Sequence, residues 1–444
     1  MAHAHGEPNY LACRCTVPGM EKRGLVLRWT IVIGVVACFM VDLHLTRHYG
    51  GIDLRDKVVG SRSLMEGRSL YYNPWRPGDP ERLADPMLPP GTAMTRYTGT
   101  PFQALLMAPV AALPFGEGRM AWLVIQYALL IGSVLFTARA FGRDDPARQA
   151  VVAAVVLLLF VACQSWRLHV ERGQVYVLPM AVLALLFVAL KARREVATGV
   201  LIAVLVLIKP TNAIIVAPLL LVATWRTWTG AAGFTALMAG IFALLGGGLR
   251  AWAEYFAAMR TWNSLPDPSE PPVVEGANYT YPSVIEGMAG LDAHHAMEFE
   301  NGSIPAILHV LGLDIPAWTP WALLVALLLG IVLVAGRRLR RMPAWDLLLL
   351  GFCCWVLFML FLRVPSFDYQ VVVWAAPLVV LLLSHGKQPL AWNVLALAAA
   401  ALLLGALSLL PVNVLLAEAI MLGLVGQVLW KGLRAPSRPL VQAE

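Results

Sequence analysis

The stretch Gly51–Tyr72, GIDLRDKVVGSRSLMEGRSLYY, follows the first long hydrophobic run of the chain and introduces charge where that run ends. Two carboxylates, Asp53 and Asp56, lie near its start among several basic side chains. A carboxylate that is held at the face of a bilayer and flanked by cations is a candidate general base beside an anion-binding site. The stretch therefore predicts a reactive site where the chain leaves its first apolar segment.

The composition on either side of this stretch is typical of a membrane protein. Of the 444 residues, 59% are hydrophobic and 14% are charged, and the mean hydropathy is +0.69. Because soluble domains are about a quarter charged and less than half apolar, we expect an all-α polytopic membrane protein. The net charge of +7 is explained by Lys and Arg in short cytoplasmic loops, so it does not indicate a nucleic-acid partner.

The hydrophobic runs and the basic residues between them predict about twelve transmembrane helices with both termini in the cytoplasm. Basic residues precede the first run, Leu25–Leu45, and no small-residue cleavage site marks it as a signal peptide, so we expect a retained anchor. We expect a multi-pass protein of a bacterial inner membrane. The expected segments are a tail at 1–24, one membrane domain at 25–430 with extracytoplasmic loops at about 46–100 and 250–316, and a tail at 431–444.

Several segments are expected to lie along or within the membrane without crossing it. The first loop is rich in proline, which prevents long helices after its opening part, and in that part Val58–Leu70 is amphipathic and suited to the interface. The apolar segment Pro101–Pro114 is too short to span. We expect it to be re-entrant or interfacial, with the next crossing at Met120–Ala138.

A helical hairpin is predicted around residues 209–212, with sequence KPTN. The flanking apolar segments, Val196–Ile208 and Ala213–Trp225, are each too short to span comfortably. Broken helices of this kind are tolerated where they line a cavity or are buried in protein. One kinked crossing would place the arginines of 337–341 outside, against the positive-inside rule, so the hairpin is preferred, with Lys209 at its outer apex.

Lys209 is the clearest candidate among the ionisable residues expected at the outer face. Placing an unpaired lysine at membrane depth costs about 2.5–3.5 kcal/mol on the insertion scale. A cavity that holds an anion, such as a lipid phosphate, reverses this preference. The alternative is a lysine whose side chain simply extends to the interface.

Two further outer turns carry candidate residues. Arg172 and Gln174 lie where a helix begins, which favours an anion, although an ordinary capped turn has the same pattern. Arg363, Asp368 and Tyr369 lie on another turn, where Asp368 is also suited to pair with Arg363.

The sequence has no pattern for a metal or a nucleotide cofactor. Cys13 and Cys15 lack the spacing of structural zinc ligands, as do His294 and His295 in the second loop. The cysteines in apolar segments are expected to act as small hydrophobic residues. No P-loop, dinucleotide-binding motif or nucleophile elbow is present, so we expect no cofactor and no metal.

Five short motifs occur in one order along the chain. The first is Asp53 followed by Gly67 and Tyr71, and the second is Tyr97 with Pro101-Phe102, leading to Pro109 and Pro114. The third is Gly173-Gln174 before a helix, and the fourth is Lys209-Pro210 after the apolar helix that contains Gly199. The fifth is Ser366 and Tyr369 before an apolar run that contains Pro377.

Taken in this order, the motifs resemble glycosyltransferase family 87 of the GT-C superfamily, a group similar to mycobacterial mannosyltransferases that use polyprenyl-phosphate-mannose. The resemblance covers Asp53–Leu383. The chain departs from the family pattern at Asn278–Thr280, where the family often has Asn-Gln-Ser, and at Asp368, where it often has His.

The resemblance implies a GT-C-type helical bundle and a glycosyltransferase. The expected reaction moves a sugar, mannose or a similar hexose or pentose, from a polyprenyl phosphate donor to a hydroxyl of a glycan or glycolipid acceptor. It proceeds with inversion on the extracytoplasmic side, among membrane lipids. Asp53 is the expected general base, because a hydroxyl needs to lose its proton as it attacks.

The other candidate residues are expected to bind substrate. Lys209 and Arg172, with Arg363 behind them, are the cations expected to meet the charge of the leaving phosphate. Asp56 is expected either to orient Arg55 or to bind acceptor hydroxyls. The full set of predicted substrate-binding residues is Asp56, Arg172, Gln174, Lys209, Arg363, Asp368 and Tyr369.

Two other functions fit parts of the sequence. Broken helices and buried charge also suit a transporter or flippase of lipids or glycans, but the sequence shows no inverted repeat. A polymer ligase is likewise multi-spanning with a large outer loop, but it leaves the carboxylates of the first loop without a role.

Overall fold

The computed structural model describes most of the predicted membrane domain. The described residues are 20–48, 51–71, 78–86, 97–245, 248–263, 304, 308, 312–313, 316, 318–339, 342–361, 368–384 and 411–434. In these ranges all regular structure is helical, which confirms the all-α class. Outside them lie most of the second loop, most of both tails and the apolar residues 390–410, which the sequence predicts to be one of the transmembrane helices.

The helices follow one another along the described parts of the chain in this order. They are α1 (Met20–His48), α2 (Ile52–Met65), η1 (Glu81–Leu83), α3 (Pro101–Ala111), α4 (Phe115–Phe141), α5 (Pro146–Ala162), α6 (Gln164–Arg172), α7 (Val177–Lys191), α8 (Glu195–Ile208), η2 (Pro210–Asn212), α9 (Ala213–Val216), η3 (Ala217–Leu221), α10 (Trp225–Leu244), α11 (Gly248–Asn263), α15 (Thr319–Leu339), α16 (Ala344–Phe361), η4 (Asp368–Trp374), α17 (Ala375–Ser384) and α19 (Pro411–Arg434).

Several of these helices can cross a membrane. In the described part of the chain, four are long and apolar enough, within α1, α4, α10 and α16. The pair α5 and α6, bent by 61° at its break, makes a fifth if it forms one span. Other apolar helices, including α7 and α8, are shorter than a usual span, so the total of about twelve crossings stays a prediction.

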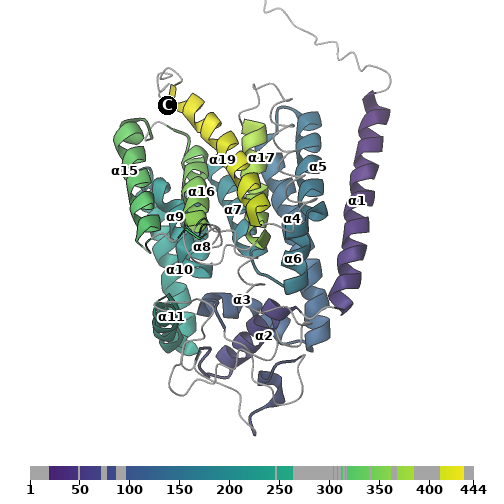
Figure 1. Cartoon of the computed structure of the whole chain (residues 1–444), viewed down its shortest axis with the longest axis vertical. Helices are drawn as coiled ribbons and strands as arrows, with labels where there is room; N and C mark the ends of the chain where they lie inside the picture. The colour runs from purple at the N-terminus through teal and green to yellow at the C-terminus, as the bar shows by residue number, and fades with distance from the viewer. Residues whose placement is uncertain are drawn as a thin grey trace, which may run out of the picture.

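Most helices stand side by side in one bundle, whereas α2, α3 and α11 lie across one end of it (Figure 1). The middle of the bundle is formed by α4, α7, α16 and α17, which contact one another through buried apolar side chains. At the end of the bundle, Arg62 joins α2 to α3. Its Nε donates to the Ala111 carbonyl oxygen at 2.9 Å and its Nη2 to that of Leu113 at 3.0 Å. The segments predicted not to cross thus form a layer over one end.

Helices α8 and α10 run in the same direction in close contact. Near their starts, a methyl group added to Gly199 would overlap the carbonyl oxygen of Thr227. Near their ends, Ile208 belongs to the same buried cluster as Met238 and Phe242. The chain between two such helices must travel back along them.

This return confirms the predicted turn at Lys209, which has extended backbone at φ −153°. The second half of the hairpin differs from the prediction: instead of one helix over Ala213–Trp225, it consists of η2, α9 and η3 and ends at Leu221, and Trp225 begins α10. The following proline disfavours helical backbone at Lys209, which ends α8 there. Asn212 Nδ2 then donates to the Leu205 carbonyl oxygen in the last turn of α8 at 3.0 Å, which fixes the apex.

The second polar segment differs from the prediction at its start. Residues Gly248–Asn263 form α11, although a loop was expected from residue 250. Ala251 and Tyr255, four residues apart, are buried against the other helices, which is the spacing of one helical face. Ser69 Oγ donates to Glu254 Oε2 at 2.5 Å, so α11 is also joined to the first loop.

We expect Gly199→Ala to lower the stability of the protein by about 1–3 kcal/mol, because the added methyl group forces α8 and α10 apart. Thermal unfolding of the purified protein in detergent measures this. Gly233→Ala in α10 is the matched control, since a Cβ there meets no atom within 4 Å. Equal unfolding midpoints for the two variants would contradict the close approach.

Candidate functional site

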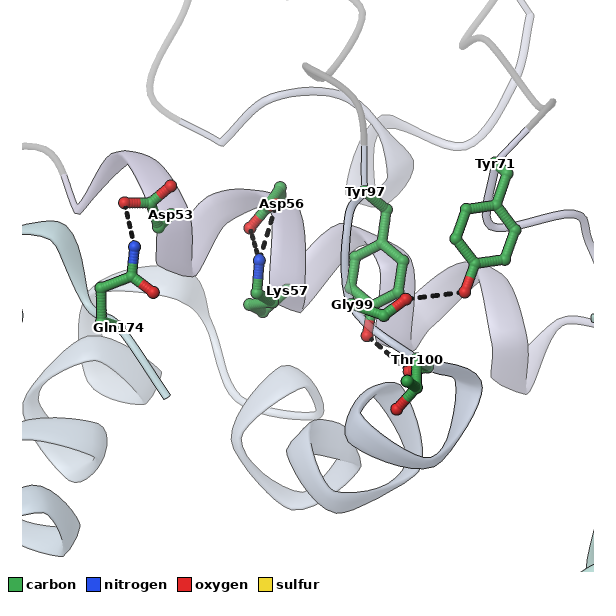
Figure 2. A network of polar contacts seen from close by, with 8 residues as sticks. All are labelled: Asp53, Asp56, Lys57, Tyr71, Tyr97, Gly99, Thr100 and Gln174. Carbon is green, nitrogen blue, oxygen red and sulfur yellow. Dashed lines mark hydrogen bonds and ion pairs between the residues drawn. The ribbon is translucent and has the colours of Figure 1, made fainter. Parts of the chain in front are cut away.

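Helix α2 carries a row of charged residues along the end of the bundle. Leu54 and Val58, four residues apart, are buried in the main core and fix the rotation of the helix. Figure 2 shows Asp53, Asp56 and Lys57 following one another along the helix, with Gln174 opposite Asp53. The part of the first-loop stretch that carries these charges, Ile52–Met65, is therefore a helix packed on the bundle.

Asp53 contacts a residue more than a hundred positions later in the chain. Gln174 Nε2 donates to Asp53 Oδ2 at 2.6 Å (Figure 2). The Gln174 carbonyl oxygen is itself held by α4, since it accepts from Trp122 Nε1 at 3.2 Å and from Gln126 Nε2 at 3.0 Å. The carboxylate is thus oriented by an amide that the bundle core keeps in place.

The turn that presents Gln174 depends on Gly173. Gly173 ends α6 in the left-handed conformation, φ 70°, and the Gln174 N–H donates to the His169 carbonyl oxygen at 2.9 Å, as in a Schellman motif. A Cβ at Gly173 would also overlap the side chain of Leu54. Glycine is required both for the backbone angle and for the close approach of α2.

Lys209 is bound to the same turn. Its Nζ donates to Tyr176 Oη at 2.9 Å and lies 5.0 Å from the centre of the Tyr176 ring. The end of α8 before it is held by Thr100, whose Oγ1 donates to the Leu207 carbonyl oxygen at 2.8 Å. Residues 174–176 therefore contact Asp53 on one side and Lys209 on the other.

Asp56 forms a buried ion pair with its neighbour. Lys57 Nζ lies 2.8 Å from Asp56 Oδ2 and 3.0 Å from Oδ1, and both side chains are buried. Burial raises the pKa of Asp56 above its usual value; Lys57 opposes this shift and Asp53 adds to it. Burial lowers the pKa of Lys57, but Asp56 and Asp53 outweigh it, so the net shift is upward. The pair is a fixed element of the site.

The expected partnership of Asp56 with Arg55 is not found. Arg55 Nη1 instead pairs with Asp85 Oδ1 at 2.9 Å, and both side chains are buried. This pair attaches the middle of the first loop to α2. Whether Asp56 contacts the acceptor stays a prediction.

Aromatic residues continue the site beyond Lys57. Tyr71 Oη donates to the Gly99 carbonyl oxygen at 2.7 Å, and Tyr97 Oη to that of Thr100 at 2.9 Å (Figure 2). Lys57 Nζ lies 5.5 Å from the centre of the Tyr97 ring. Tyr97 and Tyr71, both in the sequence motifs, thus connect the charged row to the start of α3.

The remaining predicted residues are only partly described. Arg172 is the last residue of α6, two residues before Gln174, so it lies close to the site. Asp368 and Tyr369 begin η4, which packs against α6 and α7. Arg363 lies outside the described residues. Their roles in substrate binding stay predictions.

Three residues that the fold brings to the site were not predicted from the sequence: Lys57, Tyr176 and Arg119. Lys57 directly follows Asp56, and Tyr176 lies two residues after Gln174. Only their contacts in the folded protein distinguish them from other residues near the predicted ones. Arg119 lies in α4 beside Gly51, with its Nε 3.1 Å from the position of a Cβ there. Within the described ranges, no three His, Cys, Asp or Glu side chains gather to hold a metal ion.

Comparisons with known proteins place this site in a family. No curated protein matches the chain. The chain is similar to the crystal structure of ArnT from Cupriavidus metallidurans bound to undecaprenyl phosphate, with 16% identity and a TM-score of 0.38 over 91% of this chain and 77% of that one. The model of glycosyltransferase family 87 matches residues 97–365, which include the Gln174 turn and Lys209. This match over more than half of the 444 residues shows that the chain is a membrane protein belonging to glycosyltransferase family 87.

Proposed function

We propose that the protein transfers a sugar from a polyprenyl phosphate donor to a hydroxyl group of a membrane-associated glycan or glycolipid, with inversion at the sugar carbon. The observation that carries the proposal is the turn at 174–176, which contacts both Asp53 and Lys209. Base and cation are thus held by one rigid segment. The proposed sugar is mannose or a similar hexose or pentose, as the resemblance implies.

In the proposed reaction, Asp53 accepts the proton of the acceptor hydroxyl as its oxygen attacks the sugar carbon. The bond between that carbon and the phosphate oxygen breaks, and polyprenyl phosphate leaves with the bonding electrons. A positioned general base contributes about 10²–10⁴-fold to such a step. Gln174 supports this role because its amide holds one carboxylate oxygen at 2.6 Å, which leaves Oδ1 to take the proton.

Lys209 is the proposed partner of the leaving phosphate. Its hydrogen bond goes to the neutral Tyr176 hydroxyl, and no carboxylate in the described chain forms an ion pair with it. A cation without an acidic partner is suited to stabilise the charge that develops on the phosphate. The short helices on both sides of Lys209 leave its backbone fixed, so the charge is preorganised.

The proposed site is on the extracytoplasmic side of the membrane. The opposite end of α7 carries Lys191, Arg193 and Arg194, and α4 ends there with Arg139. Lys191 Nζ lies 4.6 Å from the centre of the Trp345 ring and 5.3 Å from that of Phe141, so these ends meet. Basic residues favour the cytoplasmic side, which supports an extracytoplasmic position for the end with α2.

We expect Asp53→Asn to reduce transfer by at least about 10²-fold, because the amide cannot accept the proton. Transfer of labelled sugar from synthetic polyprenyl-phosphate-mannose to a membrane lipid extract measures this with purified protein. Asp79→Asn is the matched control, since this Asp of the same loop pairs with Arg68 at 2.8 Å and should keep full activity. If Asp53→Asn retains most of the activity, the base lies elsewhere and Asp56 is tested next.

We expect Lys209→Met to weaken binding of undecaprenyl phosphate by at least about tenfold, the contribution of one hydrogen bond to a charged group. Titration of the purified protein in detergent measures the affinity. Lys191→Met removes a lysine that also lies over an aromatic ring, at the other end of α7, and should leave the affinity unchanged. Equal affinities for the wild type and Lys209→Met would exclude the phosphate role.

We expect Gln174→Met to lower kcat by about 10–100-fold with little change in the KM for donor, because the amide orients the base and a small misplacement is costly. Steady-state kinetics with varied donor measure both constants. The Gln174 carbonyl, which binds Trp122 and Gln126, is kept in this variant. A raised KM with unchanged kcat would show instead that Gln174 binds substrate.

A further inference from the structure

Arg119 is a buried cation to which the transfer reaction above gives no role. Its side chain is only 7% exposed, and its Nη2 is buried without a hydrogen-bond partner. Glu171 and Arg55 act on it electrostatically, but in the part of the chain that the structure describes no acidic side chain forms an ion pair with it. Buried polar groups are nearly always hydrogen-bonded, so an open guanidinium nitrogen indicates a ligand.

The guanidinium of Arg119 lies against the start of α2. A Cβ placed on Gly51 would be 3.1 Å from Arg119 Nε and 3.6 Å from Cζ. Gly51 precedes α2 in the left-handed conformation, φ 56°, and provides no side chain that caps the helix. The first N–H groups of a helix have no partner within it and form the positive end of its dipole. Two sources of positive potential therefore converge beside the first turn of α2, which contains Asp53.

Asp53 does not occupy this position in the structure, because its Oδ2 accepts from Gln174 instead. The two cations without carboxylate partners contact different elements. Arg119 lies against Gly51 before Asp53, and Lys209 lies against Tyr176 beyond the Gln174 turn. Tyr176 also interacts electrostatically with Lys57, so Lys209 lies toward the Lys57 side of Asp53, and Arg119 lies toward the Gly51 side.

The stereochemistry of inversion indicates on which side of Asp53 the donor and the acceptor bind. The attacking hydroxyl and the leaving phosphate lie on opposite faces of the sugar carbon in a displacement with inversion. If the donor phosphate binds Lys209, as the proposed function has it, the acceptor approaches Asp53 from the other side. Arg119 is the cation on that side.

We propose that Arg119 and the first turn of α2 form a second oxyanion site, which binds a phosphate-type group of the acceptor beside the hydroxyl that Asp53 deprotonates. The acceptor class is then an amphiphile with an anionic headgroup and a free hydroxyl. This inference rests on the proposed function for the identity of the ligand as acceptor. The anion site itself rests on the contacts of Arg119.

The experiment compares two short-chain lipids that both carry a free hydroxyl and differ in one phosphate, 1-octanoyl lysophosphatidic acid and 1-octanoylglycerol. Their affinities are measured with the full chain in neutral detergent, with excess undecaprenyl phosphate present so that the donor site is filled. We expect the wild type to prefer the lysophosphatidic acid by about 10–100-fold, as for one charge-assisted interaction. Arg119→Gln should abolish this preference, and Arg139→Gln, at the exposed far end of α4, should keep it.

Two results would overturn the proposal. One is a phosphate preference that survives Arg119→Gln. The other is a loss of undecaprenyl phosphate affinity in Arg119→Gln as large as in Lys209→Met, which would place Arg119 in the donor site. If Arg119→Gln does not fold, Arg119→Lys decides: a preference reduced by about threefold or more supports the site, and an unchanged preference contradicts it.

The binding assay also separates this inference from the proposed function. The assay requires no turnover, so its result for Arg119 does not depend on catalysis. A wild type without transfer activity, or an Asp53→Asn variant with full activity, would reject the transfer mechanism and leave that result unchanged. A phosphate preference lost in Arg119→Gln, together with active Asp53→Asn, would leave an anion site whose ligand is not this acceptor. Loss of the preference and loss of activity together support both.

Discussion

The left-handed turn at Gly173 is the constraint on which the site depends. It lets α2 approach the end of α6 so closely that no other side chain fits against Leu54. The residues that follow then reach two partners, Gln174 to Asp53 and Tyr176 to Lys209. Since α4 holds the Gln174 carbonyl, the positions of Asp53 and Lys209 are set by the bundle core rather than by the loop that carries Asp53.

The charges around this turn fall into two groups. Arg55 with Asp85, and Lys57 with Asp56, are buried pairs that neutralise each other and fix the first loop. Breaking such a pair by removing one partner costs about 3–5 kcal/mol, which suits a structural role. Lys209 and Arg119 form no ion pair with a described carboxylate. In the proposed function they are the cations that bind anionic ligands, from two directions around Asp53.

Local signals predicted the parts of the site that are continuous in sequence. A lysine before a proline between two short apolar segments indicated the hairpin, and Gly-Gln before an apolar run indicated the turn. Arg119 was not predicted because its neighbour Gly51 comes from another helix, and its sequence context is an ordinary helix start. Likewise Asp56 was expected beside Arg55, but Asp85, brought back by the folded loop, takes Arg55 instead. Helix α11 was obscured by the polar residues around it.

The central claim is that donor phosphate and acceptor hydroxyl meet across Asp53 within this one site. The most direct measurement is an experimental structure of the Asp53→Asn protein with a polyprenyl-phosphate sugar bound. The account predicts the phosphate within hydrogen-bond distance of Lys209 Nζ and the sugar carbon facing residue 53, next to Gln174. A phosphate bound at the other end of the bundle, near Lys191, would contradict it.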